Sequence, residues 1–346
     1  MSYKLTVIIP TYNSELNILP SIESVINQSI GFENIELILV DDGSTDSTRN
    51  ILNEYSRKYE NIKCFFPKEH CGNAGRGRNI GINNSTSNYI MFLDSDDYYI
   101  KNICEVLFNT ITKYDKDIVM CNHKVIKNGD FSIAKDIKQD FTISFYDPQK
   151  DETIFNNGYM WNKIFKKEYL NKYNIRCPEN FICEDLVFGI EAFLYTPEII
   201  FLNKYYGYLY NVRDSKTNYS TMNKANLRKF NETLEAFYKS VEILKNHEKE
   251  DLIKFILKNQ FTTLISLFIR LDIDRKTKIK CLEELYEFKK YANLYYPINE
   301  NWAEFFNKNI EKRNFSFLII YSKFLNYLYN SKGIRELYRK IYKNYD

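Results

Sequence analysis

The sequence lacks the cysteine, histidine and charge patterns that mark several classes of protein. Its seven cysteines include no Cys-x-x-Cys pair, so neither a zinc ribbon nor a disulfide framework is predicted and the thiols are expected to be reduced. The three histidines have no metal-ligand spacing, and the Gly-x-Ser-x-Gly motif of serine hydrolases is absent. Because 48 basic residues nearly balance 45 acidic ones, the bulk charge predicts no nucleic-acid partner.

Long apolar runs are also missing. No uninterrupted apolar stretch approaches the roughly 18 to 20 residues that a membrane-spanning helix needs. The N-terminus leads directly into Lys4-Leu-Thr-Val-Ile-Ile-Pro10, without a basic region or cleavage site, so no secretory signal peptide is predicted. We therefore expect a cytoplasmic protein, and its 346 residues allow about two domains.

The first 120 residues alternate short runs that predict strands with segments of helical periodicity. The runs that predict strands are 5–9, 35–40, 62–66, 89–93 and 117–121. Strands separated by helices indicate an α/β fold with a mainly parallel sheet covered on both faces. In such sheets ligands bind beyond the carboxyl ends of the strands.

The pattern changes along the rest of the chain. Residues 122–220 are mixed: we predict a hairpin within 131–146 and helices over 159–173 and 183–195. After about Ser220 only helical stripes occur, the first of them with apolar residues spaced by three and four from Leu227 to Leu244. The predicted domains are therefore a catalytic domain over 1–220 and a helical domain over 221–346.

Polar clusters follow three of the predicted strands: Pro10-Thr-Tyr-Asn13, Asp41-Asp42 and Asp94-Ser-Asp-Asp97. Residues i and i+2 of an extended segment point the same way, so Asp94 and Asp96 are placed to reach one ligand. Carboxylate oxygens suit Mg²⁺ or Mn²⁺, which completes its shell with water and phosphate oxygens. Alternatively, Ser95 or an acid caps a helix that begins near Tyr98, which accounts for one acid but not for three.

Two further segments have both a structural and a functional interpretation. Asp42 either belongs to a turn and helix cap, or accepts a hydrogen bond from a nucleobase or ribose. The stretch Gly75-Arg-Gly-Arg-Asn-Ile-Gly81 matches neither the dinucleotide fingerprint nor a P-loop. It serves an anionic ligand, through backbone amides and Arg76 or Arg78. Alternatively, the glycines allow close packing of a helix on the sheet and the arginines are solvated.

Charged residues late in the first domain are open to the same two interpretations. Glu184-Asp185 begins a predicted helix, where the helix dipole favours acids in any case. If the pair faces the cleft, it supplies the natural general base. After a further predicted strand, Arg213 and Ser215 form either a phosphate clamp or an ordinary loop.

Taken in chain order, these segments resemble the family 2 inverting glycosyltransferases of the GT-A fold, over roughly residues 4–220. They are especially like bacterial enzymes that build or decorate teichoic acids, capsules and other surface glycans. The matching segments are Val7-Ile-Ile-Pro-Thr-Tyr-Asn13, Ile38-Leu-Val-Asp-Asp-Gly-Ser-Thr-Asp46, Gly75 to Gly81, Phe92-Leu-Asp-Ser-Asp-Asp97, Trp161-Asn-Lys-Ile-Phe165, Glu184-Asp-Leu-Val-Phe188 and Tyr208 to Ser215.

The resemblance implies a Rossmann-like nucleotide-sugar-binding domain followed by helices, and a role for each matching position. It implies that Asp96 binds Mn²⁺ or Mg²⁺ on the donor diphosphate and that Asp185, beside Glu184, is the catalytic base. The donor-binding positions that it implies are Pro10, Thr11, Tyr12, Asn13, Asp42, Arg78, Asp94, Ser95, Arg213 and Ser215. Cys71 departs from the pattern, because many relatives have Asn or Gln there.

The implied reaction is a single inverting displacement from a nucleotide-sugar donor, usually a UDP-sugar. Asp185 removes a proton from a hydroxyl of a glycan or lipid-linked polymer acceptor, while Glu184 raises the pKa of this base. One rival is a sugar nucleotidyltransferase, but that class has a glycine-rich loop after its first strand, where this chain has Pro10-Thr-Tyr-Asn13. The other rival is a non-catalytic glycan-binding or scaffold protein.

The last part of the helical domain is basic and aromatic. Residues 301–346 contain nine Lys and Arg against four Asp and Glu, together with the aromatic runs 315–321 and 324–329. Such a segment lies on an anionic membrane surface, forms an oligomer contact, or simply packs as a helix with a solvated basic face. The sequence leaves these three interpretations open.

Overall fold

The structure is a computed structural model that describes residues 3–129, 140–213, 225–294 and 301–330. The chain divides into two compact units, Met1–Ser220 and Thr221–Asp346. The first unit is α/β and the second, over its described residues, is helical. Each unit has buried apolar residues of its own and is described separately.

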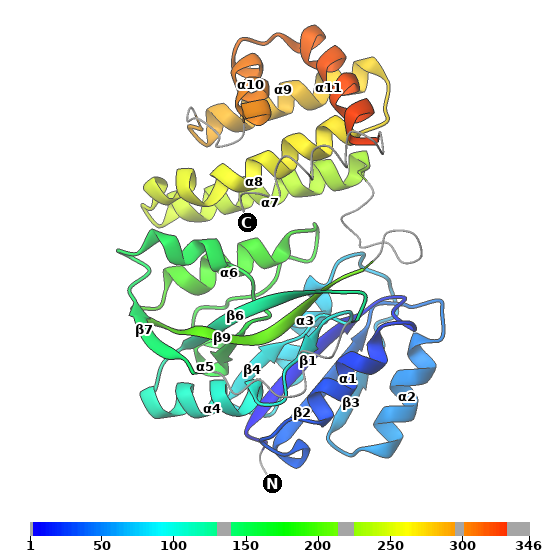
Figure 1. Ribbon diagram of the computed structural model, residues 1–346, viewed down its shortest axis with the longest axis vertical. Coiled ribbons are helices and arrows are strands. Elements are labelled where there is room, and N and C mark those ends of the chain that lie inside the picture. Colours follow the sequence, from blue (N-terminus) through cyan, green and yellow to red (C-terminus); the bar gives the residue numbers. More distant parts are fainter. Residues whose placement is uncertain (1–2, 130–139, 214–224, 295–300, 331–346) are drawn as a thin grey trace. The chain divides into compact units, whose positions relative to one another are not determined.

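A nine-stranded sheet crosses the first unit, with helices on both of its faces (Figure 1). The strand order is β3-β2-β1-β4-β8-β6-β9-β5, and β7 pairs with β9. The strands are β1 (Leu5–Thr11), β2 (Ile35–Asp41), β3 (Ile62–Phe65), β4 (Tyr89–Phe92), β5 (Tyr98–Tyr99), β6 (Ile118–Lys127), β7 (Thr142–Tyr146), β8 (Lys163–Lys166) and β9 (Ile199–Val212). The helices are α1 (Ile18–Ile26), α2 (Thr48–Lys58), α3 (Gly75–Asn84), α4 (Ile103–Tyr114), α5 (Lys167–Lys172) and α6 (Glu184–Leu194), with short 3-10 helices η1 (Phe32–Asn34) and η3 (Glu152–Asn157).

The first four strands pair in parallel with one another, as do β6 and β9. Every residue of β1 and β2 is buried, as expected of strands that helices cover on both faces. Strand β1 lies between β2 and β4 and runs parallel to both. Because parallel neighbours end at the same edge of a sheet, the polar clusters that follow these three strands converge there. The predicted α/β architecture is confirmed.

Two glycines of α3 let this helix approach the sheet closely. A Cβ atom on Gly81 would lie 2.4 Å from the Ile8 side chain, and one on Gly77 would lie 3.1 Å from the Pro10 side chain. Any larger residue at position 81 would push the helix away from β1. The close-packing interpretation is therefore confirmed for the glycines, but its other half, solvated arginines, is wrong for Arg78, whose side chain is 5% exposed.

The helix predicted over 159–173 is wrong in its first half. Lys163–Lys166 is strand β8, which lies between β4 and β6 and runs antiparallel to both, and only Lys167–Lys172 is helical. Ile164 and Phe165 are neighbours that point to opposite faces of the sheet, and both are buried. A strand that is apolar on both faces has no alternating pattern, so its sequence resembles that of a buried helix.

Two other expectations also change. The helix predicted to begin near Tyr98 is wrong, because Tyr98–Tyr99 forms strand β5 against β9. A cap at this point therefore has no helix to serve. The hairpin predicted within 131–146 lies partly outside the described residues, and its described part, Thr142–Tyr146, pairs with β9 as strand β7.

The described residues of the second unit form helices α7 (Leu227–Asn246), α8 (Glu250–Arg270), α9 (Arg275–Tyr291), α10 (Asn301–Glu311) and α11 (Phe315–Asn330). Side chains cap two of them: Asn226 accepts from the Lys229 amide at 2.9 Å, and Asp274 accepts from the Thr277 amide at 3.0 Å. The apolar stripe predicted for α7 is buried from Phe230 to Leu244, whereas its first residue, Leu227, is partly exposed.

The length and hydropathy of the described helices can be compared with those of a membrane-spanning helix. No single helix among them is both long and apolar enough to cross a membrane. The two halves of α8, Glu250–Leu257 and Gln260–Arg270, meet the length and composition criteria only when taken together across a bend of 49°.

Candidate active site

Arg78 connects the end of β4 to the start of α6. Its side chain is 5% exposed, and its guanidinium donates to Asp94 at 2.7 Å and to Glu184 at 2.5 Å. Such charge-assisted hydrogen bonds are strong where water is largely excluded. Burial raises the pKa of Glu184, and the Arg78 charge opposes this shift. One arginine thus joins two acids that lie far apart in the chain.

Asp185 follows in the first turn of α6, where the helix dipole favours an acid. Its carboxylate accepts a hydrogen bond from the Leu186 amide at 2.9 Å, and the residue is partly exposed. The pKa of Asp185 is raised, chiefly by burial; Arg78 lowers it and the negative charge of Asp94 raises it. The Glu184 carboxylate, which was expected to raise this pKa, is paired with Arg78.

The acids of the D-x-D triplet pair with different partners. Asp94 contacts Arg78, whereas Asp96 forms an ion pair with Arg213 at 2.7 Å. Asp97 is buried: it accepts the Tyr208 hydroxyl at 2.6 Å and a backbone amide of β9 at 2.7 Å. Asp97 therefore anchors the end of β4 to β9, while Asp94 and Asp96 remain partly exposed.

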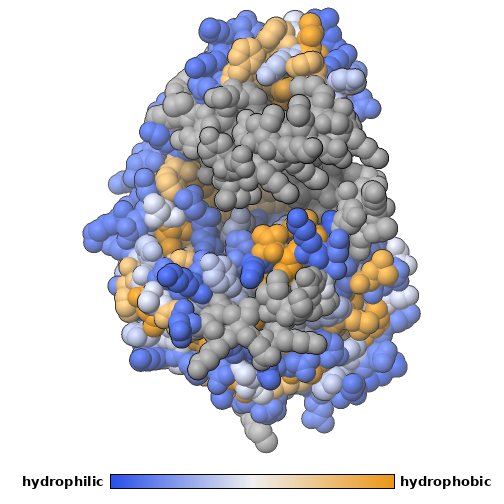
Figure 2. All heavy atoms as spheres, viewed as in Figure 1, coloured by the Kyte–Doolittle hydropathy of each residue, from blue (hydrophilic) through white to orange (hydrophobic). Residues whose placement is uncertain are grey.

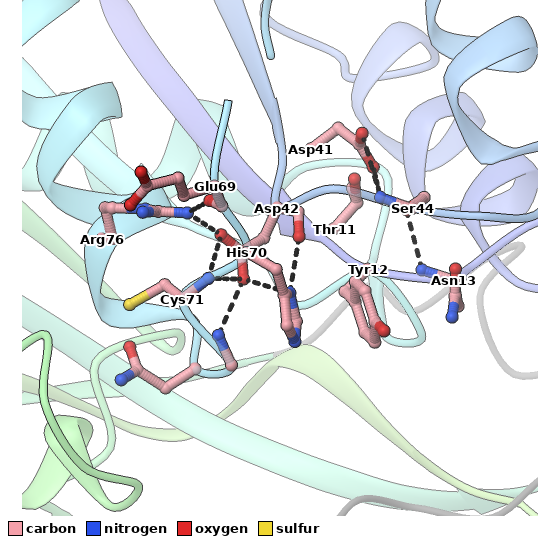
Figure 3. Close-up of polar contacts among 12 residues, drawn as sticks. Thr11, Tyr12, Asn13, Asp41, Asp42, Ser44, Glu69, His70, Cys71 and Arg76 are labelled. Atoms are coloured by element: carbon pink, nitrogen blue, oxygen red, sulfur yellow. Dashed lines mark hydrogen bonds and ion pairs between the residues drawn. The ribbon is translucent and has the colours of Figure 1, made fainter. Parts of the chain in front are cut away.

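Asp42 organises the loop that follows β3 (Figure 3). Its carboxylate accepts the backbone amides of Cys71 and Gly72 at 2.9 and 3.0 Å. Arg76 and the Nδ1 atom of His70 approach the same carboxylate at 2.5 and 2.9 Å. Cys71 thus meets Asp42 through its backbone, and this contact does not depend on the identity of its side chain.

Tyr12 and His70 form a stacked pair beside Asp42 (Figure 3). Their ring centroids are 4.2 Å apart with an interplanar angle of 26°, and Tyr12 is 46% exposed. Next to it, the Asn13 amide donates to the Ser44 hydroxyl at 2.9 Å, which ties the end of β1 to the loop after β2. Thr11 is buried at the end of β1. A planar base could stack on the exposed ring pair.

The other predicted site residues are placed as follows. Ser95 lies on the acidic tip, with its hydroxyl 2.9 Å from that of Ser14, and Pro10 lies under α3 against Gly77. Ser215 lies outside the described residues. Over the described part of the chain, no group of three or more His, Cys, Asp or Glu side chains is arranged around a common metal position.

Sequence reasoning missed an aromatic column beside the site. Trp161 stacks on Tyr208 at 4.1 Å and on Tyr159 at 4.8 Å between centroids. It also missed Cys183, which precedes α6 with φ of 65°, a left-handed conformation that is uncommon outside glycine. Tyr159 and Trp161 lie between η3 and β8, whereas Tyr208 lies much later in the chain on β9, so only the fold brings the three rings together. No residue preference signals the left-handed cysteine.

The chain was then compared with known proteins. A model of glycosyl transferase family 2 matches residues 6–174. The chain is 33% identical over 256 residues to the minor teichoic acid biosynthesis protein GgaB of Bacillus subtilis, covering 72% of this chain and 27% of that protein. It is 30% identical to the poly(ribitol-phosphate) beta-N-acetylglucosaminyltransferase TarP of Staphylococcus aureus, covering 71% of this chain and 75% of TarP. Across the first three relatives the chain spans only 27% to 32% of their length.

Solved structures show the same fold. S. aureus TarS, residues 1–349 in complex with UDP, matches with a TM-score of 0.66 at 21% identity, over 97% of this chain and 91% of that one. A complex of the same TarS fragment with UDP-GlcNAc gives the same score. A mannosyltransferase of Pyrobaculum calidifontis, solved with GDP-Man and Mn²⁺, matches with a TM-score of 0.52 at 12% identity, over 96% of this chain and 89% of that one. With its matching domain and its similarity to TarP, the chain belongs to glycosyl transferase family 2.

Proposed function

We propose that this chain is an inverting glycosyltransferase that moves a sugar from a UDP-sugar to a hydroxyl of a bacterial surface glycan or teichoic-type polymer. The observation that carries the proposal is the Asp94–Arg78–Glu184 bridge. It joins the end of β4, where the donor is expected, to the start of α6, which carries the candidate base Asp185. The names of the relatives GgaB and TarP support the class of acceptor, and the TarS complexes support the class of donor.

Different residues of the site would bind the base and the diphosphate of the donor. Tyr12 and His70 offer an exposed ring pair for the uracil, and Asp42 holds the neighbouring loop in place. Arg213, 18% exposed beside Asp96, offers a guanidinium for the diphosphate. Guanidinium groups suit phosphate oxygens because they present several donors in one plane.

The transfer step then follows from the position of Asp185. Its carboxylate takes the proton of an acceptor hydroxyl as that oxygen forms a bond to the anomeric carbon of the donor. The bond from this carbon to the diphosphate breaks, and the leaving nucleoside diphosphate takes the electron pair. Arg213 stabilises the developing charge electrostatically. Attack from the face opposite the leaving group inverts the anomeric centre.

A divalent cation, Mn²⁺ or Mg²⁺, fits the acidic end of β4. The side chains of Asp94 and Asp96 are 29% and 27% exposed, so their oxygens are accessible to a donor-bound ion. Such an ion needs only one or two protein carboxylates when phosphate oxygens complete its shell. Asp96 would hold it, after release from Arg213. When bound, the ion neutralises charge on the diphosphate.

The two rival functions differ from this proposal at defined residues. A sugar nucleotidyltransferase needs a phosphate-binding loop after β1, where Asn13 instead ties this loop to Ser44. A non-catalytic glycan-binding protein would use Asp185 only to accept hydrogen bonds from sugar hydroxyls, so Asp185→Asn should leave its function intact, whereas a transferase should lose turnover.

The decisive experiment measures UDP release. The chain is incubated with Mn²⁺ and a panel of nucleotide sugars, with and without glycan and teichoic-type acceptors. We expect acceptor-stimulated release with one UDP-sugar, and a loss of about 100-fold or more in Asp185→Asn, with UDP binding retained. Glu168→Gln, an exposed carboxylate-to-amide change on α5, is the matched control and should keep full activity. Full activity in Asp185→Asn would refute the catalytic assignment.

We also propose that the basic aromatic surface of α10 and α11 attaches the protein to an anionic membrane. Phe317, Ile320, Phe324 and Tyr327 recur at helical spacing on α11 and are 46% to 71% exposed. Figure 2 shows apolar side chains flanked by hydrophilic ones at this end of the second unit. The exposed cations of α10, α11 and the turn between them are Lys308, Lys312, Arg313 and Lys323, against the acids Glu304 and Glu311. Exposed apolar side chains in a segment with an excess of cations complement an anionic lipid surface; a contact between copies of the chain is the alternative.

A further inference from the structure

Three aromatic rings stack in a column that begins beside the Asp94–Asp97 segment after β4. Its base is Tyr208, a buried side chain whose hydroxyl donates to Asp97 at 2.6 Å. Trp161 stacks on Tyr208, with centroids 4.1 Å apart and an interplanar angle of 26°. Tyr159 stacks on Trp161 in turn, at 4.8 Å and 18°. The inner two rings are buried, whereas Tyr159 is 42% exposed, so the column ends in an open ring face.

The column broadens into a surface. Tyr210 lies nearly parallel to Trp161, at 6.2 Å and 16°, and is 40% exposed. The His123 ring meets Trp161 edge-on at 4.9 Å. Strands β6 and β9 bring His123 and Tyr210 close together. His123 pairs with Tyr208, and Val125, the next residue on the same face of β6, pairs with Tyr210. We call Tyr159, Trp161, Tyr210 and His123 the aromatic surface.

The aromatic surface lies beside the candidate base. A Cβ atom on Gly189 would lie 2.3 Å from the carbonyl oxygen of Gly158, so the residue before Tyr159 packs directly on α6. Gly189 is four residues after Asp185, and residues with that spacing share one face of a helix. In agreement, the pKa of Tyr159 is raised, first by burial and then by the charge of Asp185.

The surface is also held rigidly. The amino group of Lys163, a fully buried side chain on β8, donates to the backbone carbonyls of Asn157 and Tyr159 and to the side chain of Asn162. These contacts fix the backbone that carries Tyr159 before any ligand binds. A preorganised ring loses little freedom when a ligand stacks on it.

Resting on the proposed function, we infer that the aromatic surface binds the acceptor as a pyranose sugar, whose apolar C–H face stacks on Tyr159 while one of its hydroxyls reaches Asp185. Ring stacking needs a flat apolar face, which a pyranose has and an open-chain polyol phosphate lacks. A polyol phosphate would instead need accessible cations. Burial, and then the charges of the carboxylates Asp96, Asp97 and Asp185, raise the pKa values of the exposed tyrosines on the surface. The cation that contacts the surface, Lys163, is buried with its amino group on backbone carbonyls. The site therefore selects a sugar-terminated acceptor over a bare ribitol phosphate or glycerol phosphate chain.

Direct binding tests the inference without turnover. The chain has two tryptophans, so in a Trp302→Phe background the fluorescence of Trp161 is observed alone. The probes are the methyl glycosides of glucose, galactose, N-acetylglucosamine and rhamnose, set against ribitol 5-phosphate and glycerol 3-phosphate. We expect at least one glycoside to change the emission saturably and both polyol phosphates to leave it unchanged. A saturable response to a polyol phosphate, or to none of the probes, would overturn the inference.

Variants provide the second test. Tyr159→Ala should raise the acceptor KM or the glycoside Kd by about tenfold, whereas Tyr159→Phe, which keeps the ring, should restore both. Phe145→Ala removes an equally exposed ring from β7 and should have no effect. UDP binding in each variant verifies that the donor end has folded. If Tyr159→Ala does not fold, Tyr210→Ala repeats the test.

The two proposals can fail separately. If no nucleotide sugar is consumed but glycosides still bind at Trp161, the proposed transferase function fails and the sugar-binding surface stands. If transfer to a ribitol phosphate polymer occurs at the same rate in the parent and in Tyr159→Ala, the transferase function stands and the sugar-binding inference is overturned.

Discussion

Single residues show how the site holds five acids close together. Asp94 and Glu184 share Arg78, Asp96 has Arg213, and Asp97 accepts a tyrosine hydroxyl and a backbone amide. These partners lie on α3, α6 and β9, so the sequence around each acid does not identify them. Among the described residues Asp185 forms no ion pair: its carboxylate accepts a hydrogen bond from the Leu186 amide and is stabilised by the nearby Arg78 charge, which suits a group that must exchange a proton.

This difference leads to a prediction about pH. Because burial raises the pKa of Asp185 above the ordinary 3.8, the base is protonated, and inactive, over a wider acidic range than a free aspartate. We expect kcat/KM to fall as the pH is lowered through this raised pKa and to be constant above it. The fall in kcat/KM at low pH reports the protonation of Glu184 and Asp185 together, because the two carboxyl groups interact. A profile that stays flat down to about pH 4 would contradict this assignment.

A second prediction at this scale concerns the donor base. Tyr12→Ala removes the exposed ring of the Tyr12–His70 stack, and stacking of a base on an aromatic ring contributes about 1 to 3 kcal/mol. Titration calorimetry should therefore show UDP binding weakened by at least about fivefold. Tyr12→Phe should bind normally, as should Tyr206→Ala, which removes an equally exposed ring from β9. Unchanged binding in Tyr12→Ala would place the base elsewhere.

At the level of elements, the sequence predicted the parallel strands well and the antiparallel ones poorly. β1, β2 and β4 are mostly apolar runs followed by polar residues, so both their state and the edge at which they end could be inferred. β8 and β5 depend on pairing with strands distant in the chain, and local periodicity does not contain that information. The same limit hid the aromatic column, whose rings meet only after β8 and β9 enter one sheet.

The contact between η3 and α6 gives a prediction about an element. Gly189→Ala would place a Cβ atom 2.3 Å from the Gly158 carbonyl, so the backbone before Tyr159 must move. Such overpacking costs about 1 to 3 kcal/mol of the free energy of unfolding, and we expect a lower Tm together with slower transfer. Gly158→Ala is the matched control, because its nearest contact would be an ordinary 3.4 Å. Equal Tm values for the two variants would contradict the proposed packing.

At the scale of the whole molecule, the second unit carries the surface that we propose for membrane binding. All of the described residues that we assign to the site lie in the first unit. The stripe on α11 faces away from the buried residues Leu318, Ile319 and Ser322, so the core of its own unit does not need it. Natural surfaces seldom keep several large apolar side chains exposed together without a partner.

The membrane proposal is tested on that stripe. Ile320→Asp and Phe324→Asp change residues that are 69% and 55% exposed, so the fold should be retained while binding to phosphatidylglycerol vesicles is lost in a flotation assay. Binding of the parent protein should weaken as salt is raised and be absent on phosphatidylcholine alone, because cations supply part of the attraction. Leu16→Asp, an equally exposed apolar-to-acid change in the first unit, is the control and should bind normally. If Ile320→Asp instead dissociates an oligomer and the parent protein binds neither kind of vesicle, the stripe is a contact between copies of the chain. Raised salt should then leave the oligomer intact, because salt screens charges and does not weaken apolar contacts.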